Sequence, residues 1–355
     1  MPHGNGLRGL DEATPAWSNI PLDTGGMVMR RLTRWTAIVC VLLGVSGFAN
    51  AQGSFPDRPV KFVIAFPPGG ATDTFFRQLV AEVSAALGQP AVIENRGGGG
   101  GYIAWQQVAN ADPDGYTLLV AENALGVSQA LYKNHSSGFD PLKQYDAIAA
   151  IASTPLVLAV ANNIPANNFA ELVAYSKAQP NAMAYAHAGA GSVSHLVYEV
   201  IRDGAGMNTL PVPYKGGGPA MGDVVAGHVS SVVSAMSVGK PLVEGGKVKG
   251  FAVTSPQRSP ALPNVPSLKE LGVKHADVDL QFWWGIFGPK GIPAPVREKL
   301  EKTFQTVMAN PGVRERLAKV DTTTTFAPGT ALRVKLENEI KNWSTFIDSK
   351  GIKVE

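Results

Sequence analysis

Glycine-rich turns recur along this chain where a short apolar run ends and a helical pattern begins. Residues 60–66 read as a buried strand, glycine and proline break it at 67–70, and apolar positions from 75 to 87 follow with helical spacing. Gly88 is a natural stop for this helix. Two further strands and a short helix follow at 91–94, 116–121 and 103–109. This βαβαβ order predicts a largely parallel sheet.

The alternation continues to the end of the chain and predicts two α/β lobes. The first would hold residues 52–153 and 281–355, and the second residues 154–280. Two chain crossings would then form a hinge beside a cleft, and ligands of open sheets bind beyond the carboxyl ends of the strands. The predicted strands are 156–160, 183–186, 210–213, 229–234, 250–254 and 282–288, and the main helices are 169–178, 194–201, 219–226, 241–244, 296–308 and 331–347.

The N-terminal region has the pattern of a cleaved secretory signal peptide. Arg30, Arg31 and Arg34 precede an apolar run of about 14 residues, which ends in a small-x-small signal at residues 49–51. The run is shorter than the roughly 20 residues that a membrane-spanning helix needs. We therefore expect cleavage after Ala51 and a periplasmic protein. Residues 1–28 would be an extension before a start at Met29.

Composition excludes several classes of function. Apolar residues make up 45% of the chain and charged residues 17%, which is typical of a globular protein. The net charge is only +3 and the basic residues are scattered, so nucleic acid is not an expected partner. The single cysteine, Cys40, falls in the signal peptide, which leaves the mature chain without a disulfide or thiol nucleophile. The histidines lack metal-ligand spacing, and we expect no cofactor.

Four strand-end loops carry the residues that could bind a ligand. In residues 66–73, glycines permit close backbone approach, and the helix that follows favours an anion, with Thr72 or Asp73 as its cap. In residues 188–195, Ser192 and Ser194 can cap a helix or donate to a ligand, and His195 could face the cleft. Ordinary tight turns would explain either loop without any ligand.

The other two loops differ in charge. Tyr214 offers a ring and a hydroxyl, and Lys215 either pairs with a carboxylate or lies on the surface. Glu122, followed by Asn123, would repel an anionic ligand unless it meets an amine or hydroxyl. Enzyme motifs are incomplete: residues 126–130 lack the last glycine of a nucleophile elbow, and residues 245–248 lack the hydroxyl of a phosphate loop. A secreted hydrolase using Ser192 and His195 stays as an alternative.

Several longer motifs occur in order along the chain, at residues 66–73, 88–90, 94–96, 113–118, 130–133, 212–216 and 259–266. Together they resemble the periplasmic solute receptors of tripartite tricarboxylate transporters, the Bug family. The resemblance covers roughly residues 55–355.

This resemblance implies a two-lobed periplasmic-binding-protein fold of type II, a Venus flytrap that closes on a small carboxylate without catalysis. The ligand could be a dicarboxylate, a tricarboxylate, an acidic amino acid or an aromatic acid. The partners would be the integral membrane subunits of the transporter, or a membrane receptor in a signalling role, and we expect a monomer. The expected ligand-binding residues are Pro68, Gly69, Gly70, Thr72, Asp73, Glu122, Asn123, Ala188, Gly191, Ser192, Ser194, Tyr214 and Lys215.

Two departures from the family pattern bear on the ligand. Ser234 and Ala235 stand where an Asp-Asn pair is frequent, and Glu122 stands where a small neutral residue is usual. Glu122 would suit a ligand with an amine. A ring-bearing acid is the other possibility, since aromatic residues crowd the same region at Phe76, Tyr102, Trp105, Trp283 and Trp284, although most such aromatics belong to a core.

Overall fold

The computed structural model describes residues 55–131, 139–179, 183–274 and 280–350. The predicted signal peptide, with Cys40, lies outside the described residues. Across the described ranges, no helix combines the length and apolar character needed to cross a membrane.

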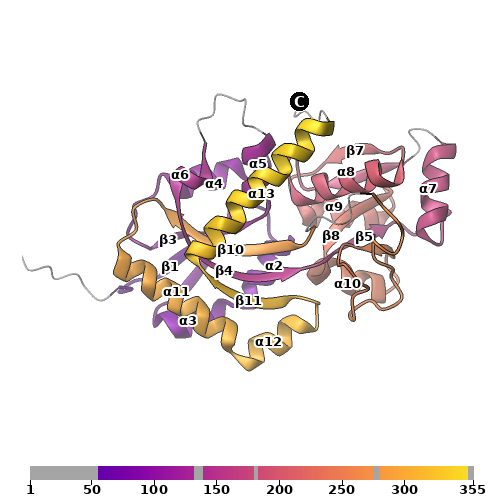
Figure 1. The fold of residues 1–355 in the computed structure, drawn as a ribbon. Coiled ribbons are helices and arrows are strands. Elements are labelled where there is room, and N and C mark those ends of the chain that lie inside the picture. The colour runs from indigo at the N-terminus through magenta and orange to yellow at the C-terminus, as the bar shows by residue number, and fades with distance from the viewer. Residues whose placement is uncertain (1–54, 132–138, 180–182, 275–279, 351–355) are drawn as a thin grey trace, which may run out of the picture. The chain divides into compact units, whose positions relative to one another are not determined.

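Within the described residues, the first sheet has six strands (Figure 1). They are β1 (Val60–Ile64), β2 (Ala91–Asn95), β3 (Thr117–Glu122), β4 (Tyr145–Thr154), β10 (Phe282–Pro289) and β11 (Thr323–Pro328). Their order across the sheet is β11-β4-β10-β3-β1-β2. β1 pairs in parallel with β2 and β3, whereas β10 runs antiparallel to β3 and β4, and β11 antiparallel to β4.

The second sheet has five strands in the described part of the chain. They are β5 (Leu156–Val160), β6 (Ala184–His187), β7 (Leu210–Pro213), β8 (Ser231–Ala235) and β9 (Lys249–Val253). Their order is β7-β6-β8-β5-β9. β6 is parallel to β7 and β8, while β5 is antiparallel to β8 and β9.

The expected parallel pairing is confirmed for β1, β2 and β3, but both complete sheets are mixed. The sequence analysis did not predict β4 or β11, and β4 and β10 bring the antiparallel pairings into the first sheet. β4 is rich in alanine, a residue that is depleted in strands, and its buried positions do not alternate with a period of two. The local pattern therefore did not indicate a strand there.

Helices lie at the predicted places, with one of them interrupted, and the helices at Ala124–Leu131 and Pro141–Gln144 were not predicted. The helix expected across 75–87 is interrupted, because the N–H of Gln78 bonds back to Phe75 and Phe76 and ends its first part. Gly88 ends the second part in the left-handed conformation, as predicted. The helices are α2 (Ala71–Arg77), α3 (Val80–Leu87), α4 (Tyr102–Ala109), α5 (Ala124–Leu131), α6 (Pro141–Gln144), α7 (Phe169–Ala178), α8 (Val193–Ala205), α9 (Gly217–Ala226), α10 (Met236–Glu244), α11 (Ala294–Ala309), α12 (Pro311–Ala318) and α13 (Gly329–Lys350).

The chain passes between the two sheets at adjacent points. β4 ends at Thr154 and β5 begins at Leu156, so a single residue, Pro155, separates the sheets there. The return passes into β10, where Phe282 pairs with Thr154. Two neighbouring crossings restrict relative motion of the sheets to a bend or twist about this point. The exact lobe limits of the sequence analysis stay a prediction.

Candidate functional site

A cavity of about 500 Å³, counting the part open to solvent, lies between loops of the first sheet and loops of the second. The centres of water-sized molecules can reach only about 50 Å³ of it, so the loops lie close around the cavity in this structure. The first-sheet side contributes Phe66, Gly70, Ala71, Thr72, Glu122 and Phe282. The second-sheet side contributes Leu156, Ala188, Ser192, Val193, Ser194, Gly217, Val233, Ser234, Ala235 and Val238.

Four helices begin at this cavity. Its lining includes the first residues of α2 and α8, the first residue of α9, and Ala235 immediately before α10. The caps of α2, α9 and α10 make no side-chain hydrogen bond to the helix. The first backbone N–H groups of a helix have no partner inside it, and the dipole makes that end partly positive. The arrangement therefore favours a negatively charged group in the cavity without a lysine or arginine.

The first loop divides into residues that line the cavity and one that supports it. Gly70 and Thr72 line the cavity, whereas Pro68, Gly69 and Asp73 are not part of its lining. Asp73 accepts a hydrogen bond from the N–H of Gly69 at 2.9 Å and pairs with Arg77 at 2.9 Å. Burial would raise the pKa of Asp73, but these hydrogen bonds hold it below its ordinary value. Asp73 thus fixes the shape of the turn.

The second loop presents Ala188, Ser192 and Ser194 to the cavity. The Ser192 hydroxyl caps α8 by accepting from the N–H of His195 at 3.3 Å, and it also lies 3.1 Å from the hydroxyl of Ser194. The N–H of Ala188 donates to Ser194 at 3.0 Å. The two serines therefore hold the loop together while remaining within reach of a ligand.

His195 stands behind this loop and does not line the cavity. Its Nδ1 accepts from the N–H of Gly191 at 3.3 Å, and its ring stacks on His187 with centroids 4.5 Å apart. Burial, with His187 nearby, lowers the pKa of His195 to about 3. So weak a base is poorly suited to activate Ser192 near neutral pH. Gly191, with a φ of 77°, shapes the turn and is not part of the cavity lining.

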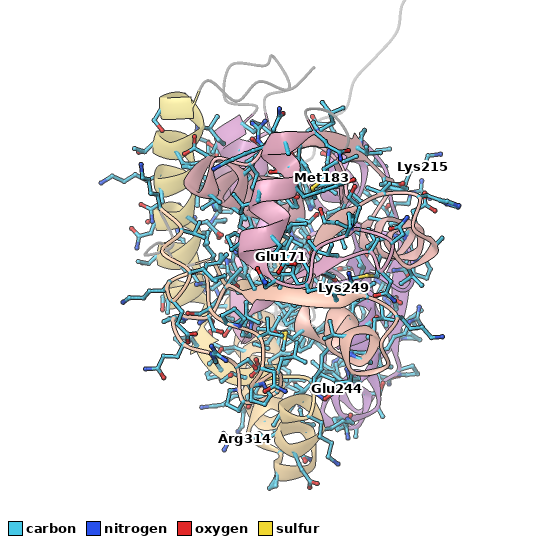
Figure 2. The ribbon with its side chains drawn as sticks, turned by 90° about the vertical axis from the view of Figure 1, so that its right-hand side faces the viewer. Glu171, Met183, Lys215, Glu244, Lys249 and Arg314 are labelled. Carbon is cyan, nitrogen blue, oxygen red and sulfur yellow. The ribbon has the colours of Figure 1, made fainter. Side chains whose placement is uncertain are left out.

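The third loop differs from expectation, because neither Tyr214 nor Lys215 lines the cavity. The Tyr214 hydroxyl donates to Asp223 at 2.6 Å. Lys215 is exposed and projects from the surface (Figure 2). Gly217, two residues further on, lines the cavity instead. Backbone at the start of α9 occupies the place that the sequence analysis gave to these side chains.

Glu122, the last residue of β3, has a buried carboxyl group that faces the cavity. The indole N–H of Trp284 donates to the Thr72 hydroxyl at 3.1 Å, and Thr72 in turn donates to Oε2 of Glu122. Burial raises the pKa of Glu122 to about 7, and the bond from Thr72 opposes the shift. Among the described residues that line the cavity, Glu122 is therefore the one with an acidic or basic side chain.

Asn123 is buried, and its side chain forms hydrogen bonds to the segment in which the chain returns to the first sheet. It accepts from the N–H of Trp283 at 2.9 Å and donates to the carbonyl of Gln281 at 3.0 Å. Glu339 of α13 accepts from Asn123 at 2.7 Å and from the Trp283 indole at 2.7 Å. Asn123 and Glu339 together hold the return crossing next to the cavity. Sequence analysis did not identify Glu339, since nothing in its helix pattern indicates that contact.

Glu339→Gln should make the pH dependence of stability less steep. Burial raises the pKa of Glu339 to about 7, so the folded protein binds its proton more tightly than the unfolded chain does. Stability from this group is full below pH 4.5 and falls as the pH rises to about 7. We expect the variant to remove about 1–3 kcal/mol of the loss between pH 5 and pH 8.

Urea unfolding at several pH values measures this effect. Glu337→Gln, on the exposed side of the same helix, is the matched control and should keep the wild-type slope. Equal slopes for wild type and Glu339→Gln would show that Glu339 is not held in this environment.

Glycines allow the loops to approach each other across the cavity. A Cβ at Gly216 would lie 2.7 Å from Cδ of Pro67, and one at Gly100 would lie 2.9 Å from the carbonyl oxygen of Ala190. At Gly218 the nearest atoms would be the backbone of Gly69, at 3.4 Å. The loops of the two sheets therefore lie close together at these points, without room for larger side chains.

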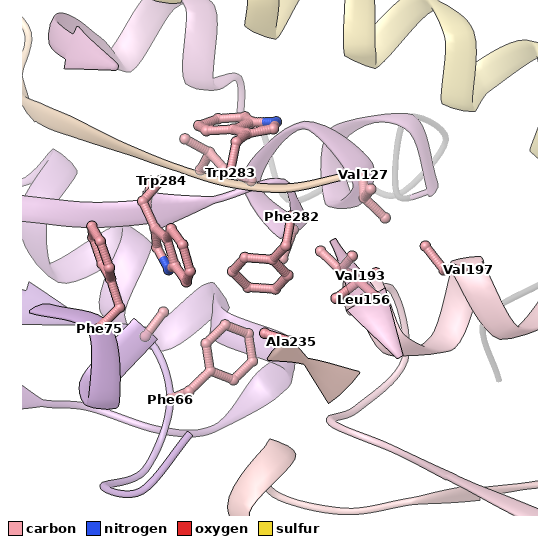
Figure 3. Close-up of a cluster of buried hydrophobic side chains, with 14 of the residues drawn as sticks. Phe66, Phe75, Val127, Leu156, Val193, Val197, Ala235, Phe282, Trp283 and Trp284 are labelled. Carbon is pink, nitrogen blue, oxygen red and sulfur yellow. The ribbon is translucent and has the colours of Figure 1, made fainter. Parts of the chain in front are cut away.

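An apolar wall completes the cavity and was missing from the expected site. Figure 3 shows Phe66, Phe282 and Ala235 lying together, with Leu156 and Val193 beside them. Ser234 and Ala235 end β8 directly before α10, so the strand-end rule that selected the other loops applies to them as well. No comparable signal marks Leu156 or Phe282, which are ordinary strand residues. Within the described ranges, no group of three or more acidic, histidine or cysteine side chains could hold a metal ion.

Two mixed β-sheets flanked by helices and joined by adjacent crossings, with a cavity between their loops, are the arrangement of a solute-binding protein. Residues 75–352 match the family described as the tripartite tricarboxylate transporter family receptor. The chain belongs to this family.

Solved structures of related proteins agree with this assignment. The periplasmic binding protein BugD superimposes with a TM-score of 0.81 at 34% identity, covering 85% of this chain and 100% of BugD. A Rhodopseudomonas palustris protein solved with adipate has a TM-score of 0.80 at 29% identity, covering 84% of this chain and 99% of that protein. MatC of the same organism, solved with bound malate, has a TM-score of 0.77 at 31% identity, covering 82% and 99%. The family and the two-sheet fold predicted from sequence are confirmed.

Proposed function

We propose that this chain captures a small carboxylate-bearing solute in the periplasm and, once closed, delivers it to the membrane subunits of a tripartite tricarboxylate transporter. The observation that carries the proposal is the convergence of four helix N-termini on one cavity. Charge-assisted hydrogen bonds from backbone N–H groups and serine hydroxyls would hold the carboxylate. The malate in MatC and the adipate in its relative support this ligand class.

Closure would complete the site because each sheet supplies only part of the lining. The solute would first meet one set of loops, and bending at the two crossings would then bring in the other set and exclude water. The close approach of Gly216 to Pro67 and of Gly100 to Ala190 supports this proposal. The closed surface would be the form that the transporter recognises, and loss of closure would abolish delivery.

A thermal-shift screen of mono-, di- and tricarboxylates with the mature protein tests the proposal. A ligand present at 100 times its Kd stabilises a folded protein by about 2.7 kcal/mol. Gly70→Leu should remove that shift and leave the fold intact, because Gly70 lines the cavity with a φ of −73° that any residue adopts. Gly222→Ala in α9, where a Cβ meets nothing within 4 Å, is the control. Unchanged melting across the panel, with correctly folded protein, would contradict the proposal.

A further inference from the structure

Glu122 is an unusual group for a cavity that is otherwise arranged to bind an anion. Among the described residues of its lining there is no lysine, arginine or histidine, and Glu122 supplies the only carboxyl group. Its residue is 8% exposed, so its charge is largely removed from water. A buried carboxylate without an opposite charge is costly, and a bound group that supplies that charge gains correspondingly.

The hydrogen bonds around Glu122 leave one of its two oxygens for the ligand. An indole N–H can only donate, so the Thr72 hydroxyl accepts from Trp284 and its own hydrogen goes to Oε2 of Glu122. This relay occupies Oε2 as an acceptor. No other side-chain hydrogen bond reaches Glu122 from the described residues, so Oε1 is left for a donor in the cavity, which Glu122 lines.

We propose that the solute carries a protonated amine as well as a carboxylate, and that the amine pairs with Glu122 while the carboxylate meets the helix N-termini. The inference rests on the proposed function and narrows its ligand class to amino carboxylic acids. Glu122 is then a specificity-determining residue. It accepts an ammonium group and opposes a second carboxylate at the same position.

The charged groups on the elements around Glu122 form ion pairs with one another and not with Glu122. On α2, Asp73 is paired with Arg77. On β1, Lys61 is paired with Glu94. Tyr102 of α4 is not part of the lining, and α5 and β10 carry no charged residue. The ionisation of Glu122 therefore depends on burial, on Thr72 and on the ligand.

Calorimetric titration with ligand pairs of matched skeleton tests the inference. Each pair contains a dicarboxylate without an amine and an amine-bearing counterpart. Aspartate and glutamate add an amine to succinate and glutarate, and 6-aminohexanoate has an amine in place of one carboxylate of adipate. In the wild type the amine-bearing partner of at least one pair should bind more tightly than the dicarboxylate. Glu122→Gln should weaken that partner by about tenfold or more, and should leave the dicarboxylate unchanged or make it bind more tightly.

Two further variants and a comparison of two pH values keep the result interpretable. Glu122→Asp retains the charge and should retain the preference for the amine, even if both affinities fall. Glu244→Gln, an exposed position on α10, should leave every affinity unchanged. With the wild type, amine-bearing ligands should bind about tenfold more tightly at pH 8 than at pH 6, because ionised Glu122 is the binding form.

The outcomes separate this inference from the proposed function. Tight dicarboxylate binding that Glu122→Gln does not improve, with weaker amine-bearing ligands, overturns the role of Glu122 and leaves carboxylate capture standing. Affinity that falls with rising pH overturns it as well, since a protonated Glu122 would then be donating to a carboxylate. Absence of binding by every member of the panel overturns both proposals.

Discussion

Trp284→Ala should lower the free energy of unfolding by about 3–5 kcal/mol, as expected when a large buried aromatic side chain is removed. Trp284 is 0% exposed and stacks on Phe75 with ring centroids 4.0 Å apart and planes inclined by 9°. Its removal also takes the N–H donor away from Thr72, the residue that holds Glu122. We therefore expect this variant to lower stability and also to change how Thr72 and Glu122 are held at the cavity.

Denaturant unfolding measures this loss. Trp284→Phe keeps an aromatic ring against Phe75 but lacks the indole N–H, so we expect a smaller loss of about 1–3 kcal/mol. Val334→Ala, at a position that is 54% exposed, should stay within about 0.5 kcal/mol of the wild type. A wild-type unfolding midpoint for Trp284→Ala would rule out the stacked core described above.

Gly216→Val should weaken ligand binding by about ten- to a hundredfold, because it opposes closure rather than contact with the ligand. The added Cβ would lie 2.7 Å from Cδ and 3.2 Å from Cγ of Pro67, both well inside normal contact distance. Overpacking of this kind costs about 1–3 kcal/mol. The cost of this contact applies to the closed state, so it appears as lost affinity, whereas the backbone strain of a side chain at φ 159° lowers stability in both states.

Titration calorimetry with the best ligand from the screen gives the affinity, and solution scattering reports whether the protein still closes. Gly222 lies in α9, which begins directly after Gly216, and a Cβ there would have no atom within 4 Å. Gly222→Ala should therefore bind the ligand like the wild type. If Gly216→Val binds the ligand normally and closes normally, the contact between Gly216 and Pro67 has no part in the mechanism.

The residues that sequence predicted best are those with a local physical signature. Strands such as β1 and β5 are continuous apolar runs, and Gly88 ends its helix in the conformation that glycine adopts most readily. β4 lacks such a signature, and it was missed although it is central to the first sheet. Its stability comes from pairing with β10 and β11, which are distant in the sequence.

The residues of the candidate site also fall into those that a local sequence pattern predicts and those that it does not. Strand-end position was enough to select Gly70, Thr72, Ser192 and Ser194, all of which line the cavity. Strand-end position does not distinguish a side chain that lines the cavity from one that only stabilises the loop. Asp73 bonds to Gly69 within its own loop, Tyr214 bonds to Asp223 of α9, and Lys215 points to solvent. Side-chain direction depends on packing against other segments, so it could not be derived from loop composition.

Sequence by itself determined the family, most of the strands and helices, and the glycine turns from which a cavity is made. Those features follow from local periodicity and from backbone conformations that glycine permits. Tertiary structure alone decided the antiparallel return of the chain, the convergence of four helix N-termini, and the Trp284–Thr72–Glu122 relay. The reason is physical: each depends on groups far apart in sequence, whose distances are fixed only when the two sheets have packed.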